Sequence, residues 1–277
     1  MAVEFPPPGF TAVMVFDDKT PNTIILNRIV KNSFALAAHT DLSTVEVNDL
    51  RDLVILIARK MLSVWKHLQA YHDEETRLTA KFTARADTHR EHPQELYEEF
   101  DVFAVQIKST LDHLVQVMRP MLGRKWSMYT FAEKGEGVLN SLRRNTGKRY
   151  VQHVELMERV LFSEVNKEWL TMIIVSRDRV NHGLAGGVTI ERFAVFRNPD
   201  GTVSLPTWNA QQTLRDAMNI AWENFFRYVE DFLALAINFR LPEEVSITKI
   251  VDRSISSPLP SWGLVKPKVA DPSADTA

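Results

Sequence analysis

Long stretches of this chain place apolar residues at intervals of three and four, which is the spacing of an α-helix with one buried face. The clearest stripes fall in residues 50–68, 100–118 and 214–236. Glycine is scarce, at 10 of 277 residues, so few positions would interrupt such helices. We therefore expect an all-α fold built from long helices.

The stripes and the residues that flank them set the expected element boundaries. We predict helices over 21–38, from about 44 through 68, over 94–121, over 150–181 as one kinked helix or two, and over 209–238, with a short helix near 137–144. Val165, Trp169 and Met172 are expected to face inward. Residues 9–17 alternate and predict a strand or a covering arm. Alternation in 188–196 and 202–205, around the Asn-Pro-Asp-Gly sequence at 198–201, predicts a β-hairpin.

These patterns predict a helical domain with an extension at each end. The domain covers residues 94–240. Residues 1–93 form an N-terminal extension, with a short extended arm and helices packed on the domain. Residues 241–277 are rich in Pro and Ser and are expected to be an irregular tail.

Composition excludes several classes of chemistry. The absence of cysteine excludes disulfides, Cys-ligated zinc, iron–sulfur clusters and thiol nucleophiles. A net charge of −2 means that any contact with RNA must come from a local patch. The Pro-rich start shows no signal-peptide pattern, and the apolar run at 53–58 is too short to span a bilayer. We expect a cytoplasmic protein without membrane contact.

The most informative candidate site is the sequence RDRVNH at residues 177–182, before Gly183. His182 can move protons near neutral pH, and Arg177 can hold a charged phosphate, so the pair could cleave RNA without a metal. If a helix ends at Asn181, His182 falls at its cap and can swing toward Arg177. Arg177 and Asn181 share a helix face, with Asp178 beside them.

A purely structural interpretation of this element stays open. Arg177 could pair with Asp101 or Asp112 on a neighbouring helix, and His182 could be an ordinary capping side chain. Spacing alone is weak evidence, since Arg and His recur at such distances by chance. The second such spacing, Arg85 to His92, is interpreted as accidental.

The Arg-Asp-x-x-x-His pattern of Arg177, Asp178 and His182, within a set of helices, resembles the motif of the HEPN superfamily (higher eukaryotes and prokaryotes nucleotide-binding domain). The helix at 100–114 is also similar to the first core helix of several prokaryotic HEPN-like families. The resemblance covers about residues 94–238. It implies an HEPN-like helical bundle, with the β-hairpin inserted between the last two core helices.

The resemblance also implies metal-independent RNA cleavage at a homodimer interface, in a toxin–antitoxin or antiviral system with an antitoxin as a further partner. His182 would be the general acid or base, Arg177 would stabilise the transition state, and Asp178 or Asn181 would orient His182. Other members of the superfamily have lost catalysis and bind a nucleotide or a protein partner. That alternative predicts that His182 is capped or paired with an acid.

RNA contact is expected from the most basic region of the chain, residues 124–149, although a solvated loop explains it equally well. The candidates are Arg143, Arg144, Lys148 and Arg149.

No metal or cofactor is expected. His89 and His92 share a helix face at best, and Glu95, Glu98 and Glu99 lack the Glu-x-x-His pairs of a carboxylate-bridged metal site. The aromatic residues at 222–232 are expected in the core or at a dimer interface.

Overall fold

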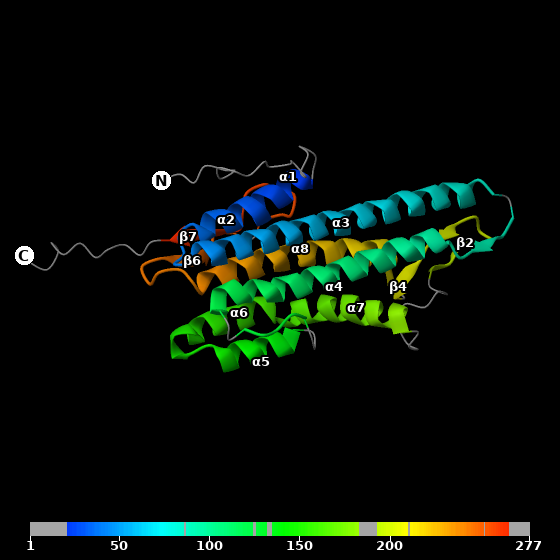
Figure 1. Ribbon diagram of the computed structural model, residues 1–277. Coiled ribbons are helices and arrows are strands. Elements are labelled where there is room, and N and C mark those ends of the chain that lie inside the picture. The colour runs from blue at the N-terminus through cyan, green and yellow to red at the C-terminus, as the bar shows by residue number, and fades with distance from the viewer. Residues whose placement is uncertain are drawn as a thin grey trace, which may run out of the picture.

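The computed structural model describes residues 21–85, 87–123, 126–131, 135–182, 193–209, 211–251 and 253–265, with the backbone alone over 176–182. This part of the chain is mostly helical and carries small antiparallel sheets. It forms an elongated bundle whose long helices run side by side (Figure 1). The expectation of a mostly helical protein is confirmed.

Two long antiparallel helices, α3 (Thr44–Thr83) and α4 (Gln94–Leu122), form one side of the bundle. A capping box starts α3: the Ser43 hydroxyl accepts from the Glu46 amide, and the Glu46 carboxylate accepts from the Ser43 amide at 2.8 Å. The predicted stripe at 50–68 continues through Tyr71, Glu75, Leu78 and Phe82, all of which are buried. The helix is therefore longer than its apolar pattern indicates.

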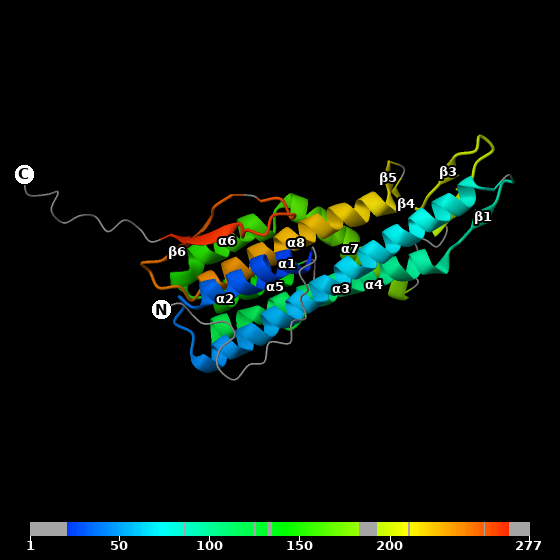
Figure 2. The same cartoon turned by 90° about the horizontal axis from the view of Figure 1, so that it is seen from above.

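The helix α8 (Leu214–Asn238) lies at the centre of the bundle (Figures 1 and 2). It contacts α3, α4, α2 (Asn32–Ala37), α6 (Val151–Leu161) and α7 (Glu164–His182). It begins later than the predicted residue 209, because the preceding residues form β4 (Thr207–Asn209) and β5 (Gln212–Thr213). The Thr213 hydroxyl then caps α8 by accepting from the Asp216 amide at 3.1 Å. The aromatic residues of α8 are buried in this chain, which places them in the core: Trp222, Phe225, Phe226, Tyr228 and Phe232.

The remaining helices cover the faces of this centre. The N-terminal segment consists of α1 (Asn22–Ile25), the π-helical η1 (Leu26–Lys31) and α2 (Asn32–Ala37), as one continuous stretch. On the other side lie α5 (Glu136–Asn145), the turn η4 (Lys148–Tyr150), α6 (Val151–Leu161) and α7 (Glu164–His182). Trp169 is buried as predicted, but Val165 is 65% exposed, so the inward stripe of α7 begins after it.

The predicted hairpin is present between α7 and α8. β2 (Val195–Arg197) pairs with β3 (Val203–Ser204) around a turn in which Gly201 has φ of +88°. A further strand, β1 (Arg90–Glu91), extends this sheet from the α3–α4 connection. The predicted residues 9–17 and 188–192 lie outside the described part of the chain.

The C-terminal segment differs from the expected irregular tail. β6 (Ser246–Lys249) and β7 (Trp262–Val265) form an antiparallel pair, anchored on α8 by the buried Ile247 and Trp262. The predicted boundary at residue 93 falls in the connection between α3 and α4. Buried residues of both helices belong to the same hydrophobic core. None of the helices within the described ranges is both long and apolar enough to cross a membrane.

Candidate functional site

The Arg-His element occupies the last turns of α7. This helix is anchored in the core by the buried Trp169, Leu170 and Ile173. Its backbone continues to His182, one residue past the predicted end at Asn181. Arg177, Asp178, Asn181 and His182 therefore share one helical segment, while their side chains lie outside the described part of the structure.

This end of α7 lies at the end of the bundle that also carries the β1–β2–β3 sheet and the start of α4 (Figures 1 and 2). The chain is described again from Phe193, whose ring is 5.1 Å from Tyr97 and 5.6 Å from Phe100, both early in α4. The chain thus leaves α7 and returns at the same end of the molecule.

The acids that could pair with Arg177 lie on α4, which packs against α7. Asp112 is already engaged, because its Oδ1 accepts from Lys108 Nζ at 2.6 Å and from the Phe131 amide at 2.6 Å. Asp101 is half-buried, about two turns after the start of the helix.

The four predicted RNA-binding residues are all exposed, around the end of α5 and the turn η4. Arg143 pairs with Glu158 at 2.6 Å, whereas the Arg149 guanidinium lies 5.6 Å from the Tyr150 ring centroid. Beside them is a hollow of about 490 Å³, whose lining includes Tyr150 and Arg240. The charge of Arg240 is compensated by Asp41 and Glu46, at 2.6 and 3.2 Å.

The structure does not bring these basic residues and the Arg-His element together within one chain. α6 and α7 follow each other along the bundle, with η4 before α6 and His182 at the far end of α7 (Figure 1). The 19 residues of α7 alone extend roughly 28 Å. The two parts of the predicted site therefore lie at opposite ends of the molecule.

A second hollow, of about 290 Å³, lies at the same end as the Arg-His element, and sequence reasoning missed it. It is lined by Thr88, His89, Arg90, Phe196 and Arg197, from β1, β2 and the residues before β1. These residues come together only through the pairing of β1 with β2, and a two-residue strand leaves no periodic signal in the sequence.

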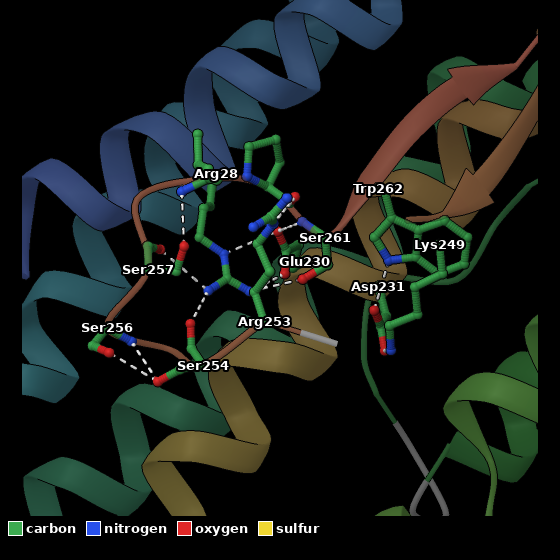
Figure 3. Close-up of polar contacts among 12 residues, drawn as sticks. Arg28, Glu230, Asp231, Lys249, Arg253, Ser254, Ser256, Ser257, Ser261 and Trp262 are labelled. Carbon is green, nitrogen blue, oxygen red and sulfur yellow. Dashed lines mark hydrogen bonds and ion pairs between the residues drawn. The ribbon is translucent and has the colours of Figure 1, made fainter. Parts of the chain in front are cut away.

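The polar clusters inside the bundle have structural roles. Arg28, Glu230 and Ser261 connect η1, α8 and the loop before β7, and beside them Asp231 accepts from Trp262 Nε1 at 2.7 Å (Figure 3). Between α3 and α8, Glu75 Oε2 lies 3.3 Å from Arg215 Nη1. Burial raises the pKa of Glu75, and Arg215 opposes that rise.

The described side chains hold no group of three His, Asp or Glu that could bind a metal ion. Glu99 instead pairs with His67 Nδ1 at 2.6 Å, and Glu98 accepts from Gln94 at 3.2 Å. His89 stacks at 5.7 Å from the ring of Phe82.

Comparison with known proteins gives no match for this chain, whether against protein-family models, curated proteins or solved structures. A functional assignment therefore depends on the residues themselves and on where the fold places them.

Proposed function

We propose that this protein is an HEPN-like, metal-independent ribonuclease that acts in the cytoplasm as a homodimer. A ribose 2′-hydroxyl attacks the adjacent phosphate, the bond from phosphorus to the 5′-oxygen breaks, and a 2′,3′-cyclic phosphate and a 5′-hydroxyl form. His182 is either the general base that takes the 2′-hydroxyl proton or the general acid that protonates the leaving 5′-oxygen. Arg177 stabilises the charge that develops on the phosphate, and Asp178 or Asn181 orients His182. A role as the toxin of a toxin–antitoxin pair or in antiviral defence is part of the proposal.

The observation that carries the proposal is the continuity of α7 to His182. It supports the proposal because positions 177–182 lie on the same helix as Trp169 and Ile173, which are buried in the core. Catalytic groups carried by a helix of the scaffold are positioned more precisely than groups on a loop.

The same observation favours a dimeric site. Positions five residues apart on an ideal α-helix are about 140° apart around its axis. With His182 inside the helix, positions 177 and 182 do not share a face of one α7. A two-fold dimer removes this difficulty, since Arg177 of one chain can act with His182 of the other.

The decisive experiment measures cleavage of mixed single-stranded RNA in EDTA by the wild type, Arg177→Ala and His182→Ala. Loss of cleavage in both variants, with helicity and dimer mass unchanged, would support the proposal. Lys167→Ala, an exposed position on the first turn of the same helix, is the control and should cut like the wild type. Equal cleavage by all variants, or none by the wild type, would reject the catalytic assignment.

Mixing the two inactive variants tests the shared site. If each site uses Arg177 from one chain and His182 from the other, a mixed dimer keeps one intact site. An equal mixture should then recover about a quarter of the wild-type rate, because half of the dimers are mixed and each has one of two sites. No recovery would place both groups of each site in one chain.

A second candidate function is non-catalytic binding of a nucleotide, and the hollow beside Tyr150 favours it. The exposed Lys148 and Arg149 could hold a phosphate, and the Tyr150 ring offers a stacking surface. Calorimetric titration with nucleoside phosphates tests this function. Binding that is lost in Arg149→Ala, in a protein that leaves RNA uncut, would favour this candidate.

A further inference from the structure

The hollow between β1 and β2 carries positive charge that no described carboxylate neutralises. Arg90 is exposed, and Arg197 is held by the carbonyl oxygens of Thr83, at 3.2 Å, and of Arg85. Both bonds of Arg197 use Nη1, so Nε and Nη2 donate to no described residue. Carbonyl groups fix the position of this guanidinium without cancelling its charge.

The acids next to this hollow are already paired. Asp87 accepts from Arg85 at 3.0 Å, and Glu91 accepts from Lys81 at 2.6 Å. The charges of Arg90 and Arg197 are therefore available to an anionic ligand. Phosphate suits them, because guanidinium groups bind its oxygens through paired N–H donors.

The hollow also offers a flat stacking surface. Arg90 and Phe196 are cross-strand partners, and the Arg90 guanidinium lies 5.9 Å from the ring centroid of Phe196. A guanidinium held against a ring presents its outer plane to a base, and bases stack on both guanidinium and aromatic planes. The volume of about 290 Å³ is at the lower limit of small-ligand pockets, which suits a single nucleotide.

We propose that this hollow binds one nucleotide of single-stranded RNA, with Arg90 and Arg197 on its phosphate and the Arg90–Phe196 pair beside its base. β1 and β2, which contribute to the lining of the hollow, lie at the same end of the bundle as the C-terminal end of α7 (Figures 1 and 2). The choice of RNA over a free nucleotide rests on the proposed ribonuclease function. The hollow is then the place where the substrate chain is held beside the catalytic element.

The test measures binding of a fluorescent single-stranded RNA by anisotropy in the full-length His182→Ala background, so that RNA is not cut. Arg90→Glu in this background should weaken RNA binding by about tenfold. The slope of log affinity against log salt concentration should also fall by about one, which corresponds to the loss of one phosphate contact. Arg90→Lys, which keeps the charge but not the plane, should lose less affinity. Arg59→Glu makes the same charge change at an exposed position on α3, outside the predicted RNA-binding residues, and should alter affinity less than about twofold.

The outcomes separate this inference from the proposed function. If RNA binding depends on Arg90 but the wild type does not cut RNA, the proposal that the hollow binds RNA stands and the ribonuclease function is rejected. If the wild type cuts RNA but Arg90→Glu binds RNA as tightly as its parent, the ribonuclease function stands and the proposal that the hollow binds RNA is rejected. Equal losses in Arg90→Glu and Arg59→Glu, absence of RNA binding, or tighter binding of a free mononucleotide than of RNA would also overturn the proposal.

Discussion

Arg28 in η1 and Glu230 in α8 form a two-point ion pair inside the protein, with Arg28 Nε 3.0 Å from Glu230 Oε1 and Nη2 bonded to Oε2 (Figure 3). Their side chains are 0% and 2% exposed. The Ser261 amide donates to Glu230 at 3.0 Å, and Arg28 Nη1 donates to the Ser254 carbonyl at 2.7 Å. The pair thus joins the first described helices, the central helix and the C-terminal loop.

Breaking this pair from one side should destabilise the fold strongly. In Arg28→Met the Glu230 carboxylate is left buried without its counter-ion, which costs about 3–5 kcal/mol of unfolding free energy. The double variant Arg28→Met/Glu230→Met removes both charges and should be less destabilised than either single variant. Urea unfolding measures the three proteins.

The exposed ion pair between Arg77 and Glu74 is the control for this prediction. Arg77→Met should change the free energy of unfolding far less than Arg28→Met, because solvent screens an exposed pair. Additive losses in the Arg28 and Glu230 variants would contradict the idea that the two groups act as a pair.

Glu75 should make stability depend on pH. Burial raises its pKa above the ordinary 4.5, so the folded protein holds this proton more tightly than the unfolded chain. The resulting stabilisation is complete below pH 4.5 and is lost as the pH rises through the raised pKa. Glu75→Gln lacks this loss, so its free energy of unfolding relative to the wild type should increase with pH over that window.

Urea unfolding at several pH values measures this difference. The comparison with the variant is essential, because burial also raises the pKa of Asp231, and that group contributes to both curves. Parallel curves for wild type and Glu75→Gln would show that Glu75 keeps an ordinary pKa.

His153 should make the fold less stable as the pH falls, which is opposite to the effect of Glu75. Burial, reinforced by Arg149, lowers its pKa below 6.5, and its ring lies 5.7 Å from Tyr150 and 5.3 Å from Phe239. The unfolded chain therefore takes up this proton first, and stability is lost as the pH falls from 6.5 through the lowered pKa. His153→Phe should reduce the fall in melting temperature on acidification. An unchanged fall would assign the acid sensitivity to other groups, such as His72, whose pKa burial also lowers.

The sequence predicts the helices better than it predicts their ends. Apolar periodicity identifies α4 and most of α8, since one face of each packs on the core. Apolar periodicity does not identify α3 beyond Leu68, because the buried face there includes the charged residue Glu75. Its partner Arg215 is distant in sequence, so the pattern gives no sign that Glu75 is buried. The β6–β7 pair is missed for a similar reason: its anchor Trp262 donates to Asp231 of α8, and local composition cannot show this contact.

Some features of the candidate site could be predicted from local sequence, whereas others depend on the fold. The Arg-His element is a local pattern, and its place at the end of a helix could be predicted from the residues around it. The distance between the Arg-His element and Arg143 or Lys148 could not be predicted, because it depends on how the helices are arranged in space. The hollow formed by Arg90 and Phe196 was also beyond sequence reasoning, since strand pairing joins two residues that carry no shared pattern.

Gly135 should be the glycine least tolerant of substitution among those described. Its φ is +94°, and a Cβ added there would lie 2.4 Å from Phe162 Cε1 and 2.7 Å from Phe131 Cζ. Gly135→Ala combines a left-handed backbone with overpacking against these rings and should cost about 2–4 kcal/mol of unfolding free energy.

Gly147→Ala is the matched control for this substitution. Gly147 has φ of −75°, and a Cβ there would meet nothing within 4 Å. The change should stay within about 0.5 kcal/mol, and a small gain is expected because alanine restricts the unfolded chain. Urea unfolding compares the two variants. A loss in Gly135→Ala no larger than in Gly147→Ala would mean that the Phe131 and Phe162 rings move aside and that the start of α5 adapts to a side chain.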